Sequence, residues 1–187
     1  DKDTSNTYTE EVDVENEALR TFETIEEYCV ITSKNELYDL VDEENLEDGE
    51  SWYAEGTVKF ETTTFTNPAN GHKVKYVWKE ENSNEIGSIE FHATIYDENF
   101  EVVGKQEIYS YSGLYTGMTF EELKTWNGEP FEFSGFGWDY AGGVMATEES
   151  RFNENPFSWT LDIDYSEETY EKFDALIGDA IWSSDAK

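Results

Sequence analysis

The chain has few of the residues that would bring it close to nucleic acid or to an anionic membrane. Only 12 of its 187 residues are lysine or arginine, against 44 aspartates and glutamates, so the formal net charge is -32. A phosphate backbone would be repelled by such a charge, which excludes nucleic acid as a partner. An anionic membrane surface is disfavoured for the same reason.

Cysteine and histidine are equally scarce. The single cysteine, Cys29, excludes an intramolecular disulfide, and its apolar neighbours are typical of a buried thiol. A catalytic thiol needs a base, but the chain has only two histidines, His72 and His92, and neither has the spacing of a zinc site. We therefore expect no catalytic cysteine, no metal and no other cofactor.

No apolar run approaches the length of a membrane span. The chain begins with a polar run, Asp1 to Thr7, that resembles the tail left after removal of a targeting segment. Residues 1–15 are predicted to be a flexible acidic tail. Such a tail would suit a spacer behind an N-terminal lipid anchor that is absent from this chain, which is the only membrane attachment we expect.

Aromatic residues, in contrast, make up 16% of the chain and apolar residues 37%. Residues 16–187 can therefore fill one domain whose core is built on Trp, Tyr and Phe. The acidity has three competing interpretations, namely solubility in a salty environment, a cation-binding surface, or a docking face for a basic partner. Because the acids are spread along the whole chain, the first is favoured.

A capped short helix is the clearest local prediction. Thr119 and Glu122 have the spacing of a capping box. The apolar positions that follow have helical spacing: Phe120, Leu123 and Trp126. Gly128 is placed to end the helix in a left-handed conformation, and Pro130 prevents its continuation.

An aromatic hairpin is predicted next. Phe131 and Phe133 alternate as in a half-buried strand, and residues 138–140 begin the return strand toward Val144.

A second helix start at Ser33, with the same spacing, predicts a helix over 34–42 and an internal duplication, with repeats at about residues 30–96 and 112–164. The alternative is that this spacing is common wherever helices begin.

Short strands separated by turn clusters account for most of the remaining chain. Alternating patterns predict strands in five places: residues 58–60, 74–78, 89–95, 108–111 and 157–163. Residues 42–50 are predicted to be an acidic loop, and a closing helix is predicted from Ser166 to Gly178. This pattern indicates an α+β fold, an antiparallel β-sheet with short helices packed on one face.

Asp139 is the best candidate for an enzymatic acid. Glycosidases need two carboxylates across a cleft, and its neighbours Trp138 and Tyr140 could stack on a sugar and raise the pKa of a carboxyl. The alternative, which we favour, is that these rings pack in a hairpin while Asp139 hydrogen-bonds the turn. A calcium loop starting at Asp162 is disfavoured, because it lacks the glycine and the glutamate of an EF-hand.

The pattern G-x-T-x-x-E-L, N-G-x-P-F and G-F-G-W-D-Y of residues 117–140 resembles a family of uncharacterised secreted proteins or lipoproteins of Gram-negative bacteria, Bacteroidetes in particular. That family has no assigned activity. More distantly, G-M-T-x-x-E-L and N-G-x-P are similar to the repeat shared by SmpA/OmlA-type envelope lipoproteins and β-lactamase-inhibitor proteins. This resemblance implies a protein-binding or assembly role in the cell envelope (periplasm or outer-membrane-anchored) or outside the cell.

We therefore expect a non-enzymatic binding module, secreted or associated with the envelope, whose partner is an unidentified protein or glycan. The candidate ligand-binding residues are Trp138, Asp139 and Tyr140. The alternative is a carbohydrate-active protein that binds or hydrolyses glycans in an aromatic cleft with acidic residues. Two carboxylates facing each other across a groove lined by Trp and Tyr would favour that alternative.

Overall fold

The structure is a computed structural model that describes residues 22–136, 141–163 and 176–185. Three α-helices lie in these ranges: α1 (Ile25–Tyr28), α2 (Lys34–Leu40) and α3 (Phe120–Asn127). They are accompanied by two short 3₁₀ helices: η1 (Glu43–Asn45) and η2 (Arg151–Glu154). The strands of these ranges are β1 (Leu46–Tyr53), β2 (Val58–Thr66), β3 (Lys73–Trp78), β4 (Ile86–Phe91), β5 (Thr94–Tyr96), β6 (Val102–Lys105), β7 (Glu132–Phe133), β8 (Val144–Met145) and β9 (Ile181–Trp182).

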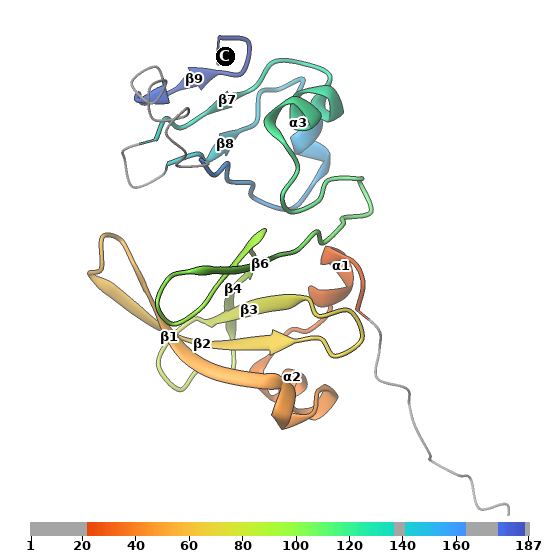
Figure 1. Cartoon of the computed structure of the whole chain (residues 1–187), viewed down its shortest axis with the longest axis vertical. Coiled ribbons are helices and arrows are strands. Elements are labelled where there is room, and N and C mark those ends of the chain that lie inside the picture. Colours follow the sequence, from red (N-terminus) through yellow and green to blue (C-terminus); the bar gives the residue numbers. More distant parts are fainter. Residues whose placement is uncertain (1–21, 137–140, 164–175, 186–187) are drawn as a thin grey trace, which may run out of the picture.

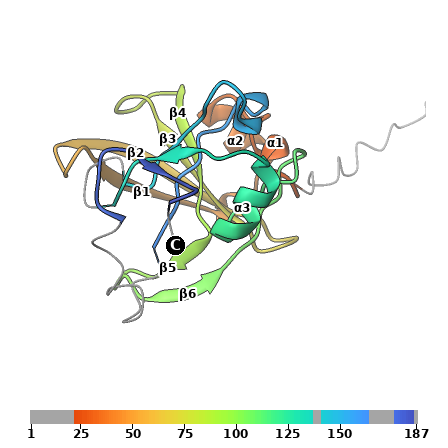
Figure 2. The ribbon, with the colours of Figure 1, turned by 90° about the horizontal axis from the view of Figure 1, so that it is seen from above.

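The elements form two groups (Figure 1). One contains α1, α2 and β1–β6, and the other contains α3 and β7–β9. The strands make three sheets, with the orders β1-β2-β3-β4, β5-β6 and β8-β7-β9, and all pairings between these strands are antiparallel. The view from above shows the β5–β6 hairpin at the edge of the molecule, away from α1 and α2 (Figure 2). The predicted α+β class is confirmed.

The four-stranded sheet depends on the alternation along β3. Val74, Tyr76 and Trp78 are fully buried and belong to one hydrophobic cluster with residues of α1 and α2. Lys73, Lys75 and Val77 occupy the intervening positions on the other face, where Val77 is also buried. The helices therefore cover one face of the sheet, as the period of two along this strand predicts.

The acidic stretch from Asp42 to Glu50 is not the loop that its charge suggests. After η1 it runs as β1, which pairs along its whole length with β2. Asp48 is held there by hydrogen bonds of 2.6 Å from the hydroxyl groups of Tyr38 and Thr63. Edge strands commonly carry charges, which prevent pairing with other molecules, and this explains why a strand looks like a loop in the sequence.

Helix α3 confirms the predicted cap. The side chain of Thr119 accepts a hydrogen bond from the backbone of Glu122, whose carboxylate accepts one from the backbone of Thr119. Leu123 is buried in the second hydrophobic cluster. Gly128 ends the helix with a φ of 80°, as predicted.

The pairing of β7 with β8 confirms an antiparallel hairpin after α3, but the predicted start of its return strand, residues 138–140, lies outside the described residues. Residues 157–163, in contrast, do not form a strand. They make two backbone hydrogen bonds to the hairpin, from Leu161 N to Gly142 O at 2.8 Å and from Val144 N to Trp159 O at 2.9 Å. Because β8 and β9 occupy both edges of β7, this segment cannot pair with β7, and its bridge between Thr160 and Gly143 lies just before the two-residue β8. Its alternation instead reflects burial, since Ile163 packs in the second cluster.

Two sequence predictions are not decided by this fold. Most of the predicted closing helix, from Ser166 onward, lies outside the described residues. The internal duplication stays a prediction: both α2 and α3 are followed by an antiparallel hairpin, but the sheets that these hairpins join have different sizes.

Candidate binding surface

Trp138, Asp139 and Tyr140, which the sequence puts forward as ligand-binding residues, lie outside the described residues. On either side of them, Phe136 is buried and Ala141 packs against the cluster that contains residues of α3 and β7. Among the described residues, no group of three or more histidine, cysteine, aspartate or glutamate side chains could hold a metal ion.

Cys29 has the properties of an unreactive thiol. Burial, together with the nearby negative charge of Glu26, raises the pKa of Cys29 to about 11. The thiol is therefore protonated at neutral pH and is a poor nucleophile. The two histidines belong to separate polar contacts, because His72 lies 3.1 Å from the hydroxyl of Tyr28 and His92 lies next to β4.

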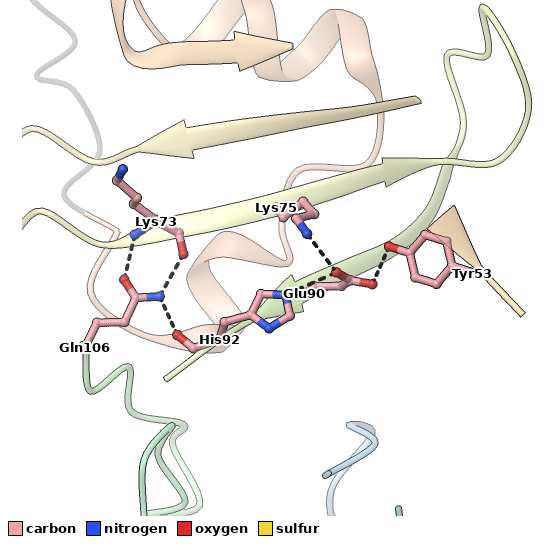
Figure 3. A network of polar contacts seen from close by, with 6 residues as sticks. All are labelled: Tyr53, Lys73, Lys75, Glu90, His92 and Gln106. Atoms are coloured by element: carbon pink, nitrogen blue, oxygen red, sulfur yellow. Dashed lines mark hydrogen bonds and ion pairs between the residues drawn. The ribbon is translucent and has the colours of Figure 1, made fainter. Parts of the chain in front are cut away.

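A polar network connects β1, β3 and β4 (Figure 3). Glu90 accepts a hydrogen bond of 2.7 Å from the hydroxyl of Tyr53, and it lies 3.6 Å from Nζ of Lys75 and 3.2 Å from Nε2 of His92. Burial opposes the charge of Glu90, but the hydrogen bonds from His92 and Tyr53 and the charges of Lys75 and His92 together outweigh it, and the pKa of Glu90 is lowered. This carboxylate stays ionised, and its partners Tyr53 and Lys75 belong to β1 and β3, so the network holds strands together.

Gln106 anchors the segment that follows β6. Its side-chain oxygen accepts a hydrogen bond of 2.8 Å from the backbone N–H of Lys73. Its amide nitrogen donates to the backbone oxygens of Lys73, at 2.8 Å, and His92, at 2.7 Å (Figure 3). The chain leaves this fixed point toward α3.

Residues 108–116 fold back on themselves in a short hairpin that exposes tyrosines. The backbone N–H of Ser110 donates to Leu114 O at 2.7 Å, and that of Thr116 donates to Ile108 O at 3.2 Å. These four side chains are buried. The tyrosines lie between them: Tyr109, which is 48% exposed, Tyr111, which is 70% exposed, and the half-buried Tyr115. The strand predicted over 108–111 is therefore reduced to isolated bridges, but its alternation is real.

Two of these tyrosines are fixed by carboxylates. The rings of Tyr109 and Tyr115 stack with their centroids 4.8 Å apart and an angle of 26° between their planes. The hydroxyl of Tyr109 donates to Oε2 of Glu107, and that of Tyr115 donates to Oε2 of Glu122, both at 3.0 Å. These hydrogen bonds raise the pKa of both tyrosine hydroxyls.

Glu26 of α1 supplies a third carboxylate. Its Oε1 accepts a hydrogen bond of 2.7 Å from the hydroxyl of Ser110, and both of its oxygens lie 3.0 Å from the backbone nitrogen of Tyr111. We define the tyrosine surface as the six residues Tyr109, Tyr111, Tyr115, Glu26, Glu107 and Glu122.

The carboxylates of the tyrosine surface are not neutralised by cations of the described part of the chain. None of the ion pairs found there includes Glu26, Glu107 or Glu122. No lysine or arginine occurs in the sequence between Lys105 and Lys124, and Lys124 pairs with Glu121 at 3.1 Å. The surface therefore combines aromatic rings with negative charge that is fixed in position by neutral donors.

Comparison with known proteins does not identify the chain: no family model matches it, and neither the curated proteins nor the solved structures include a match. The resemblance of residues 117–140 to envelope proteins thus stays an expectation. Across the described ranges, no helix has the length and apolar character needed to cross a membrane.

Proposed function

We propose that the protein is a non-enzymatic binding module that holds its partner on the tyrosine surface. The observation that carries this proposal is the group of tyrosines that the hairpin 108–116 presents outward, two of them with hydroxyls fixed by carboxylates. Exposed aromatic rings bury a large area at a small entropic cost when a partner binds. Groups that are already fixed reduce this cost further.

The ionisation of the described carboxyl groups supports binding over hydrolysis. A glycosidase needs a general acid with a raised pKa. The described carboxyl groups with a shifted pKa all have lowered values: Glu27, Asp48, Glu85, Glu90, Asp97 and Glu122. If the partner is a glycan, we therefore expect it to be bound and not cleaved.

We further propose that the protein works in the cell envelope or outside the cell. This location rests on the resemblance of residues 117–140 to secreted proteins and lipoproteins.

Selection from a random peptide display library on the full chain tests the binding site. A Tyr109→Leu/Tyr111→Leu variant removes two exposed rings and keeps the net charge. The matched control is Tyr96→Leu/Phe100→Leu, because these side chains are 52% and 87% exposed on the β5–β6 hairpin.

We expect the selected peptides to bind the wild type and the control but to bind the Tyr109→Leu/Tyr111→Leu variant much more weakly. An oligosaccharide array with the same three proteins covers the glycan alternative. If every selected ligand binds all three proteins equally, the tyrosine surface is not the binding site and the proposal fails.

A further inference from the structure

We infer that the tyrosine surface takes the arginine or lysine side chains of a basic protein segment. This inference rests on the proposed function and names the chemical class of the partner.

The first argument is the state of the carboxylates. The hydrogen bonds that other described residues donate to the side chains of Glu107 and Glu122 all end on Oε2. Their donors are hydroxyl and amide groups, which fix a carboxylate without cancelling its charge. Within the part of the chain that the structure describes, Oε1 of each of these two carboxylates accepts no hydrogen bond and can receive an incoming donor. A cation placed there gains a charge-assisted hydrogen bond, and the carboxylates do not have to be reoriented first.

The second argument is the electronic state of the rings. A phenol that donates a hydrogen bond to a carboxylate keeps its proton but is polarised by the nearby negative charge, so the face of its ring becomes more negative. Cations are attracted to that face, and a guanidinium group can lie flat on it while it donates to a carboxylate. The chain already contains a guanidinium group over an aromatic ring, since the guanidinium carbon of Arg151 lies 4.4 Å from the ring centre of Trp126 while its nitrogens donate to the backbone oxygens of Trp126 and Ser112.

Charge also argues against other occupants. A second copy of the chain would bring a further net charge of -32 and would be repelled. A sugar would bring hydroxyl oxygens that also need donors, but the charged groups of the surface, Glu26, Glu107 and Glu122, are all acceptors. A cationic segment satisfies both the rings and the carboxylates.

The test uses the full chain and a capped tri-arginine peptide, with tri-glutamine as the uncharged probe. Binding is measured by titration at about 0.15 M salt, where the screening length is about 8 Å and long-range attraction is reduced. Any anionic protein attracts arginine to some extent, so the decisive variants keep the net charge. We expect Tyr109→Leu to weaken tri-arginine binding about fivefold. Tyr109→Phe keeps the ring and should weaken tri-arginine binding less, whereas Tyr96→Leu should leave tri-arginine binding unchanged.

A second pair of variants tests the carboxylate at equal charge. Glu107→Gln should weaken binding of tri-arginine, and Glu98→Gln, on the exposed turn of the β5–β6 hairpin, should not. Equal losses in these two variants, or no loss in Tyr109→Leu, would mean general attraction to a polyanion and would overturn the inference. Thermal unfolding of each variant checks that the fold is retained.

The two proposals can fail separately. If binding of the library peptides requires Tyr109 and Tyr111 but the peptides carry no excess of arginine or lysine, the inference is wrong and the proposed binding module is retained. If the peptides bind the Tyr109→Leu/Tyr111→Leu variant as well as the wild type, the inference and the proposed function are both wrong.

Discussion

Replacing Gly142 by alanine should destabilise the protein far more than the same change at Gly128. Both glycines have positive φ angles, 73° and 80°. They differ in what surrounds them. A Cβ on Gly128 meets no atom within 4 Å, whereas a Cβ on Gly142 would overlap the carbonyl oxygen of Leu161 and lie 2.9 Å from its carbonyl carbon. Gly128→Ala is therefore a matched control for the backbone conformation alone.

The expected magnitudes follow from this difference. The left-handed conformation costs alanine roughly 1–2 kcal/mol, of which about half is recovered from the unfolded chain. Gly142→Ala must in addition push away residues 157–163. That movement breaks the hydrogen bonds from Leu161 N to Gly142 O and from Val144 N to Trp159 O, each worth about 1 kcal/mol. We expect a loss of about 1 kcal/mol for Gly128→Ala and about 3 kcal/mol for Gly142→Ala.

Thermal unfolding followed by circular dichroism measures both values. In a chain of this size each kcal/mol lowers the midpoint by about 2–4 °C. Gly142→Ala should therefore lower it by about 6–12 °C and Gly128→Ala by about 2–4 °C. Equal shifts in the two variants would show that residues 157–163 do not pack on the hairpin as described.

Two further predictions concern ionisable groups. The pKa of Glu90 is lowered below its ordinary value of 4.5, so its stabilising effect is complete above that pH and is lost as the pH falls through the folded pKa. In urea unfolding, Glu90→Gln should be less stable than wild type at about pH 7 and close to it at about pH 3. A loss of unfolding free energy that is the same at both pH values would contradict the network. The pKa of Cys29 is raised to about 11, so a thiol reagent at about pH 8 should label Cys29 slowly in the folded chain and rapidly in denaturant. Rapid labelling of the folded chain would show that Cys29 is not buried as described.

The parts of the fold that the sequence predicted are those fixed by neighbours along the chain. The cap of α3 needs only Thr119 and Glu122, which are three residues apart, and Gly128 ends the same helix. The alternation in β3 is equally local, since a strand with one buried face must repeat every two residues.

The errors have a common cause in long-range pairing. Whether Leu46–Tyr53 is a loop or a strand depends on β2, which follows it, and its charges give no sign of that partner. Residues 157–163 have the pattern of a strand, but the edges of β7 are taken by β8 and β9.

The tyrosine surface could not be predicted for the same reason. Tyr76 and Tyr109 both lie in alternating segments, yet Tyr76 is fully buried and Tyr109 is 48% exposed. The lysines of β3 mark its outward face, but residues 108–111 contain no charged residue that would mark theirs. The contact between Glu26 and Tyr111 joins residues 85 positions apart, and no local signal announces it. A residue type that suits both core and surface is placed only by the fold.

The acidity, in contrast, supports a firm prediction without any knowledge of the fold: added salt should stabilise the protein. The excess of 44 acidic over 12 basic residues produces repulsion that the unfolded chain relieves by expanding. The screening length falls from about 30 Å at 0.01 M salt to about 3 Å at 1 M, so charges repel one another over shorter distances. Salt also weakens attractive pairs, but the described residues contain only five, and exposed pairs contribute roughly 0–1 kcal/mol each. Repulsion should therefore dominate, and the unfolding midpoint should rise with sodium chloride. Calcium chloride at equal ionic strength should give the same curve. A fall in the midpoint with salt would refute the argument from charge, and a much larger rise with calcium would reveal a specific cation site that the sequence does not predict.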